Sequence, residues 1–498
     1  MDALIEIIKV LNRKRLSKID VFDKTLLNQN STNLYYKLYE GLESGKIKDD
    51  ESASLYLYGS NEKDARFRKL KSRFKAKALK SILLLDNEDF HNSEQVRAYY
   101  ECLTHNQTLE ILIKATGTTK LIYELVKDDY PKAEKYNFYD ILKNYSFYLI
   151  TYYALKGDKK SLVEEEVKYL KYIDLAQKEQ IAKYLYMKSI VNFAGSVTIN
   201  DELLENIKES LQKLHTIKLE INNSEIDFYY FYLALLYYEN GNDLHRLIDI
   251  CEEADELMNN NMQIITNSRK AVILIYRLKT LLKLKHFKEA FLVMKNFDDV
   301  YLPTENLYNW YILKEIEFKL YLQDNKLEGA YKVYEKVLAN PSFKRQVAEL
   351  TEKWKIYHAY LVFMDNYLNK GDYKFNLARF LNDVPVNSKD KSGFNFAIRV
   401  IEILFNAARK DYNLIFSKMD ALRVYRSRYL NDNTYKRNHL FLSVLLKAEK
   451  SGFNNKELVK ADWQEITELR NQNKYFIADW EIIPYETLWD IFVELAKK

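Results

Sequence analysis

The chain is poor in the residues that make turns. Its 498 residues include only 5 prolines and 11 glycines, whereas average usage is roughly 5% and 7%. A sheet protein needs such residues every few positions, because each of its short strands ends in a turn. Helices need far fewer, so the composition argues against a largely β fold and predicts an all-α one.

Cysteine and long apolar runs are also scarce. The two cysteines, Cys102 and Cys251, cannot build a disulfide framework. No stretch reaches the roughly 18 apolar residues that a membrane span requires. The start, Met1 to Glu6, is acidic where a signal peptide would be basic. We therefore expect a soluble cytoplasmic protein with no membrane partner.

Charge of one sign does not dominate the chain. Lysine and arginine total 76 against 71 for aspartate and glutamate, which gives a net charge of +5. This balance neither requires nor excludes a nucleic-acid partner. The 41 tyrosines are expected mainly in packing, since the ring packs while the hydroxyl reaches water.

What the chain does contain is a break that recurs about every 40 residues. The breaks lie at Gly157-Asp158, Gly195, Gly241-Asn242, Lys285-His286, Asn325-Lys326, Gly371-Asp372-Tyr373 and Lys410-Asp411-Tyr412. Intervals of this size are typical of stacked helix pairs. We expect a helical N-terminal region over 1–130, a repeat array over 131–425 and a helical C-terminal cap over 426–498.

The clearest repeat covers residues 228–258. Its first helix is predicted to place four residues on one face, namely Tyr230, Leu233, Ala234 and Tyr237. Its second helix is predicted to do the same with Leu244, Leu247, Cys251 and Ala254. Gly241 is expected to end the first helix in a left-handed conformation.

These positions resemble the tetratricopeptide repeat. That pattern has a bulky residue, Leu, a small residue and Tyr on the first helix, and Ala330, Tyr334 and Val337 are similar to its second helix. The resemblance implies a right-handed α-solenoid of helix-turn-helix repeats. The interval here exceeds the usual repeat of about 34 residues, so the helices or the loops are longer.

The C-terminal part has a second resemblance. The stretches 381–391, 421–430 and 481–489 are similar to a group of bacterial repeat proteins for which no activity is assigned. This resemblance supports the helical-repeat fold and implies nothing about function.

No catalytic, cofactor or metal motif is found. The seven histidines are scattered, and Cys102 with His105 offers at most two of the four ligands that a structural zinc needs. The acidic run 164–166 is interpreted as a solvated face, because consecutive helix residues point about 100° apart. We therefore expect no metal, no cofactor and no enzyme activity.

A possible partner site follows from the tetratricopeptide resemblance, in which the first helices line a concave groove that holds a peptide. The residues on the matching face are Tyr238, Lys279, Lys283, Glu315 and Lys319. Three lysines on successive repeats would hold an acidic segment or a free carboxylate. Simple solubility explains the same residues equally well, and both interpretations stay open.

The strongest charge feature is the stretch 66–80. Its basic residues are Arg66, Arg68, Lys69, Lys71, Arg73, Lys75, Lys77 and Lys80, and its apolar stripe is Phe67, Leu70, Phe74 and Ala78. The favoured interpretation is an amphipathic helix that docks by its stripe and leaves a solvated basic face. The alternative is a surface for nucleic acid or an acidic partner.

The sequence thus predicts a non-catalytic scaffold that binds a protein segment, which we expect to be acidic, in the groove of a helical solenoid. The alternative is a nucleic-acid or nucleoprotein adaptor that uses the helix over 66–80. The sequence leaves the partner's identity and the oligomeric state open.

Overall fold

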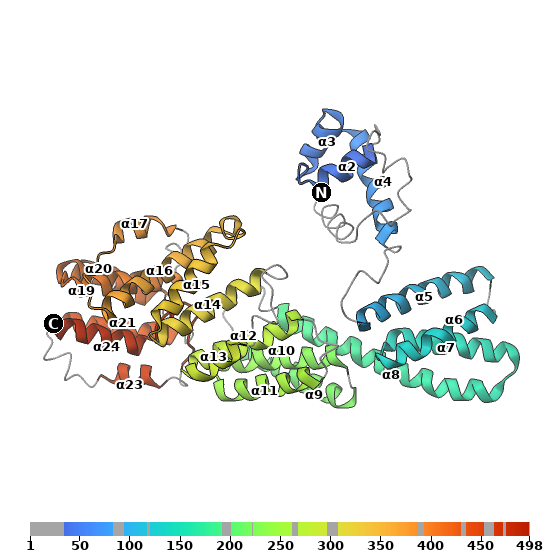
Figure 1. The fold of residues 1–498 in the computed structure, drawn as a ribbon. Coiled ribbons are helices and arrows are strands. Elements are labelled where there is room, and N and C mark those ends of the chain that lie inside the picture. Colours follow the sequence, from blue (N-terminus) through green and yellow to red (C-terminus); the bar gives the residue numbers. More distant parts are fainter. Residues whose placement is uncertain are drawn as a thin grey trace. The chain divides into compact units, whose positions relative to one another are not determined.

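The predicted all-α class is confirmed by a computed structural model of the chain (Figure 1). The structure describes residues 34–82, 94–116, 120–191, 201–221, 223–260, 267–295, 307–385, 393–429, 435–452, 463–471 and 475–497. Over these ranges the chain forms 21 α-helices and one 3₁₀ helix, and no β-strand occurs in them. The predicted break at Gly195 lies outside the described residues.

The helices group into two compact units, Met1–Lys178 and Glu179–Lys498. Their boundary falls inside one long helix, α8 (Lys159–Ile190). The sequence placed its divisions near 130 and 425 instead, where the repeat pattern begins and ends. The two divisions differ because a repeat pattern does not mark where packing contacts become sparse.

The first unit begins with three helices, α2 (Leu34–Glu43), α3 (Asp50–Tyr58) and α4 (Ala65–Ile82). They pack on one another around the apolar stripe of α4, whose residues Phe67, Leu70, Phe74 and Ala78 are all buried. An Asp49 capping box begins α3, and Gly59 ends it in the left-handed conformation. The amphipathic docking that the sequence favoured for residues 66–80 is therefore present.

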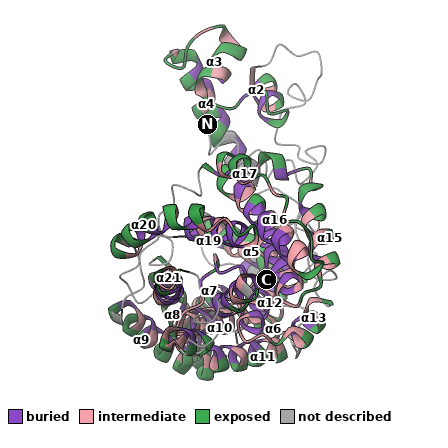
Figure 2. Cartoon of the chain, turned by 90° about the vertical axis from the view of Figure 1, so that its left-hand side faces the viewer, coloured by how far each residue is buried: buried purple, intermediate pink, exposed green. Residues whose placement is uncertain are grey.

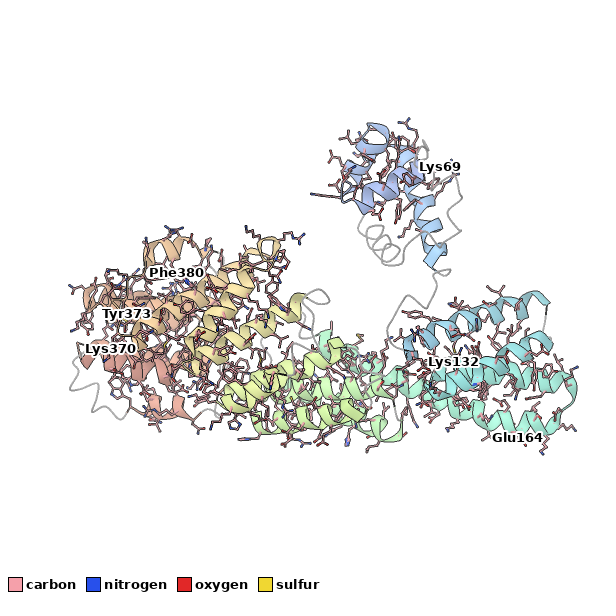
Figure 3. The ribbon with its side chains drawn as sticks, viewed as in Figure 1. Lys69, Lys132, Glu164, Lys370, Tyr373 and Phe380 are labelled. Carbon is pink, nitrogen blue, oxygen red and sulfur yellow. The ribbon has the colours of Figure 1, made fainter. Side chains whose placement is uncertain are left out.

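The same unit continues with α5 (Glu94–Thr116), α6 (Lys120–Lys135), α7 (Tyr139–Lys156) and α8. The hydroxyls of Tyr130 and Ser146 donate hydrogen bonds of 2.7 and 2.8 Å to one carboxylate oxygen of buried Glu165. The prediction of a solvated face at 164–166 is therefore wrong for Glu165, because hydroxyls from α6 and α7 replace water there. Glu164, labelled in Figure 3, and Glu166 are exposed as expected.

The second unit is a succession of helices that pack on their neighbours in the chain. They are α9 (Asp201–Glu220), α10 (Ser224–Asn240), α11 (Leu244–Asn260), α12 (Asn267–Lys283), α13 (Phe287–Lys295), α14 (Leu307–Gln323), α15 (Leu327–Leu338), α16 (Ala348–Leu368), α17 (Leu377–Asn382), α19 (Phe394–Ala408), α20 (Tyr412–Tyr429), α21 (Lys436–Lys450), α23 (Gln464–Arg470) and α24 (Tyr485–Lys497). Ala234 of α10 and Ala254 of α11 are fully buried. These small side chains allow the two helices to approach closely.

Left-handed residues end helices of both units at several of the predicted breaks. Gly157, Asn242, Lys285, Asn325 and Lys410 all have positive φ, between 56° and 71°. The expectation for Gly241 is wrong: its φ is −76°, and Asn242 takes the left-handed position. Asparagine is, after glycine, among the residues that adopt this conformation most readily.

Asn325 allows the cost of a break to be measured. Its φ is 58°, its side chain is exposed, and it follows the end of α14. We expect Asn325→Val to lower the free energy of unfolding by about 1–2 kcal/mol, because a β-branched side chain clashes in this conformation. Asn325→Gly should leave stability within about 0.5 kcal/mol. Urea denaturation of both variants tests this, and equal losses would contradict it.

The core of the second unit includes many residues of α16, α19 and α24, and Figure 2 shows α16 and α19 largely buried. Pro484 precedes α24, and its carbonyl accepts a hydrogen bond of 3.0 Å from the Leu488 N–H. The apolar face of α24 packs inward, with Trp489 and Phe492 buried. No helix in the described part of the chain has both the length and the apolar character to cross a membrane.

Candidate functional site

Four of the five predicted groove residues come together in the second unit. Lys279 and Lys283 of α12 and Glu315 and Lys319 of α14 line one cavity of about 200 Å³. Each pair is four residues apart, so both members lie on one helix face. Tyr238 is not part of this lining. It packs against Tyr237 and lies under the Arg246 guanidinium, 5.9 Å from it.

Two further side chains complete this surface, and the sequence did not predict them. Gln323 continues the row on α14, and Lys353 enters from α16. We call the set the lysine groove: Lys279, Lys283, Glu315, Lys319, Gln323 and Lys353. Gln323 follows Lys319 by four residues, so the spacing on α14 was a usable signal for it.

The chain's own C-terminal segment lies in the lysine groove. The Lys319 ammonium donates a 2.5 Å hydrogen bond to the Asp479 carbonyl oxygen, and the Lys279 ammonium is 3.6 Å from the Asp479 carboxylate. The Gln323 amide donates to the Ile482 carbonyl at 2.8 Å. These contacts join residues about 160 to 200 positions apart, which no local pattern in the sequence reveals.

A buried ion cluster fixes the downstream part of that segment. Arg437 of α21 donates two hydrogen bonds to the Glu481 carboxylate, at 2.9 and 2.6 Å, and one to Glu486 at 2.6 Å. Its third nitrogen donates to the Leu469 carbonyl at 2.9 Å. Lys285 adds an ion pair of 2.9 Å to Glu486. The cluster therefore ties residues 481–486 to α21 and to the end of α12.

Glu315, the carboxylate within the lysine groove, is already paired. Glu315 accepts from the Lys353 ammonium at 3.1 Å and from the Tyr357 hydroxyl at 3.2 Å. Lys283 lies 3.6 Å from Glu239. Lys279 therefore depends on Asp479, and no carboxylate in the described ranges lies within ion-pair distance of Lys319. The groove keeps an excess of positive charge at this point.

The proton equilibria of the groove reflect this arrangement. Burial lowers the pKa of Lys319 to about 8, and the nearby Lys353 and Lys279 add to the shift. The Asp479 carboxylate raises the pKa of Lys279. In return, the positive charge of Lys279 holds the pKa of Asp479 well below its ordinary value. Lys279 and Asp479 thus form a charged pair at neutral pH, while Lys319 titrates just above neutrality.

The basic helix α4 belongs to the first unit and carries two kinds of cation. Arg66 pairs with Asp64 at 2.7 Å and Lys71 pairs with Asp50 at 2.7 Å. The others are Arg68, Lys69 (labelled in Figure 3), Arg73 and Lys75, all exposed and without an ion pair to any described residue. The side chains of Lys77 and Lys80 lie outside the described residues.

A cluster on α5 and α6 brings together three groups that could ligate a metal. Ligand atoms of Glu101, His105 and Asp129 lie within 4.8 Å of one another. His105 Nδ1 is 2.6 Å from Asp129, and Lys132 (Figure 3) is 2.6 Å from Glu101. Cys102, which the sequence paired with His105, is buried, and burial raises the pKa of its thiol to about 12. Lys132 thus pairs with Glu101 within this cluster, and Asp129 is its only buried member.

Comparisons of the chain with family models, curated proteins and solved structures find no match. The function therefore has to be argued from the residues of the site.

Proposed function

We propose that the second unit is a non-catalytic protein-binding scaffold whose lysine groove takes an extended protein segment carrying a carboxylate. The observation that supports this is the bound segment of the chain itself, with Asp479 beside Lys279 and Lys319. We also propose that its helix pairs form a right-handed, tetratricopeptide-like array. Such arrays present long concave surfaces to extended partners.

The chemistry of the groove suits an acidic segment. Lys319 and Gln323 contact main-chain carbonyl groups, which any extended peptide offers. Lys279 contacts a carboxylate, which selects an acidic one. Replacing Lys279 and Lys319 together by glutamine should weaken binding of aspartate-containing peptides about tenfold or more, since a charged hydrogen bond contributes about 1.5–3 kcal/mol. Fluorescence anisotropy with labelled acidic peptides and their amide counterparts measures this.

The pH dependence of binding gives an independent test. The pKa of Lys319 is about 8, so its ammonium is largely protonated at pH 7 and largely neutral at pH 9. A carboxylate favours the protonated form. In the Asp479→Asn variant, which removes the groove's own carboxylate, affinity for an acidic peptide should therefore fall as the pH rises through 8, and binding near pH 8 should take up protons. Titration calorimetry in buffers of different ionisation enthalpy measures this uptake. The Lys319→Gln variant should show a flat profile over this range.

A second candidate function rests on α4 of the first unit. Small exposed residues, Ser72 and Ala76, lie between two rows of basic side chains on its solvent face. A helix of this kind fits the major groove of B-form DNA, with cations on both sides reaching phosphates. The major groove of A-form RNA is too narrow for it. We propose duplex DNA as the ligand of this surface.

Charge reversal on α4 tests this second candidate. The triple variant Arg68→Glu, Lys69→Glu and Arg73→Glu should lose DNA binding and reduce the slope of log K against log salt by about 3, one unit for each phosphate contact. The matched control reverses three exposed lysines of α8, Lys159, Lys160 and Lys171. Equal losses in the two variants would show a general charge effect and contradict a site on α4.

A further inference from the structure

The segment in the lysine groove has a definite side-chain pattern. Residues 475–480 read Tyr-Phe-Ile-Ala-Asp-Trp. The Lys283 ammonium lies 5.0 Å from the centre of the Phe476 ring, and the Asp479 carboxylate faces Lys279. An aromatic ring and a carboxylate three residues apart thus each meet a different lysine of α12. The three-residue spacing of Phe476 and Asp479 along the segment thus places the two side chains beside two lysines that are four residues apart on α12.

The two ends of the segment are held very differently. The side chain of Asp479 is 60% exposed, although it faces the groove. The Glu481 side chain is 1% exposed and is fixed by Arg437. Ile482 and Ile483 are buried beside it. Ala478 is buried and its carbonyl accepts a hydrogen bond of 3.0 Å from the Glu481 N–H, so residues 476–479 can leave the groove at the loss of this bond while the ion cluster that holds residues 481–486 stays intact. Such local opening requires far less free energy than unfolding the unit.

We propose that residues 476–479 are an internal copy of the motif that the partner presents. The partner is then an extended protein segment with an aromatic side chain three positions before an aspartate, and it binds by replacing residues 476–479 in the lysine groove. This inference rests on the function proposed above, and it adds the partner's side-chain pattern and a competitor within the chain. A tethered segment of this kind acts at an effective concentration of about millimolar.

Internal competition has a measurable consequence. A partner segment must displace Phe476 and Asp479 before it can reach Lys283 and Lys279. The apparent affinity of the intact chain is therefore its intrinsic affinity multiplied by the fraction of time that the groove is open. A variant whose own segment no longer binds should therefore have a higher affinity for an external peptide. The lysines themselves remain unchanged in such a variant.

The test uses the full chain and a labelled hexapeptide, Tyr-Phe-Ile-Ala-Asp-Trp, in an anisotropy titration. The variant Phe476→Ala with Asp479→Asn should bind this peptide at least tenfold more tightly than the unmodified chain. Asp490→Asn is the matched control and should change nothing, since Asp490 is also 60% exposed and pairs with one cation, Arg470. Changing either the phenylalanine or the aspartate of the peptide should remove most of the gain.

Each result decides a separate point. If the double variant and the unmodified chain bind the hexapeptide with equal affinity, the inference is overturned. The proposed function is upheld separately if acidic peptides that lack the aromatic residue still bind. Failure of every acidic peptide to bind either protein overturns both. Tight binding that survives the combined change of Lys279 and Lys319 to glutamine places the peptide outside the groove and also overturns the inference. Asp479→Asn alone, with Phe476 retained, repeats the test if the double variant unfolds at a lower temperature.

Discussion

Replacing Arg437 with alanine should lower the free energy of unfolding of the second unit by about 3–5 kcal/mol, because it leaves the carboxylates of Glu481 and Glu486 buried without a cation. Arg437 is 1% exposed, and its hydrogen bonds to described residues go to these carboxylates and to the Leu469 carbonyl. Guanidinium denaturation followed by circular dichroism measures the loss.

A triple variant separates lost charge pairing from lost packing. Arg437→Met combined with Glu481→Gln and Glu486→Gln removes both signs of charge and keeps similar volumes. We expect it to lose clearly less than Arg437→Ala, because it leaves no buried carboxylate without its cation. A triple variant as unstable as Arg437→Ala would show that packing, and not the unpaired carboxylates, carries the effect.

Trp354→Ala is expected to have an effect of similar size for a different reason. Trp354 of α16 is fully buried. Its ring centre lies 5.8 Å from that of Phe318 and 5.2 Å from that of Tyr357, in edge-to-face contacts. Removing so large a side chain leaves a cavity that its neighbours fill only in part, which costs about 3–5 kcal/mol. Differential scanning calorimetry of the full chain measures the shift.

Trp354→Phe is the matched control. The indole Nε1 of Trp354 has no hydrogen-bond partner among the described residues, and a buried unpaired N–H costs about 1–3 kcal/mol. Phenylalanine removes this group while it keeps most of the ring contacts, so its loss should be less than half that of alanine. If the two variants lose similar amounts of stability, the indole N–H forms a hydrogen bond in solution. The volume of the ring alone then does not determine the stability of the unit.

Local features of the sequence predicted the helical fold well. The shortage of proline and glycine argues against a fold with many turns. Glycine and asparagine at the recurring breaks indicate helix ends, and Gly157 and Asn325 have the left-handed conformation there. The stripe of Phe67, Leu70 and Phe74 on α4 also needs no knowledge of its neighbours, because its period alone identifies a buried face. The lysines of α12 and α14 were predicted to share one face by the tetratricopeptide resemblance, not by this period.

Features that depend on distant partners could not be predicted. Glu165 is an acid in an acidic run, and its burial depends on hydroxyls from two other helices. Arg437 stood in a basic stretch of α21, and its burial depends on Glu481, 44 residues later. The occupant of the lysine groove depends on Asp479, 160 residues after Lys319. Each pairing is set by tertiary packing, which the period of a single helix does not encode.

The return of residues 476–486 to α12 and α14 bears on how the second unit folds. An ordinary helical array gains its contacts between adjacent repeats, so it can nucleate anywhere and grow outward. Here Lys285 meets Glu486 across 201 positions, and closing so long a loop slows the search for the native state. During synthesis α12 and α14 emerge before the segment that covers them. We therefore expect refolding in two kinetic phases, with rapid formation of helix pairs followed by a slower closure that Arg437→Ala would impair.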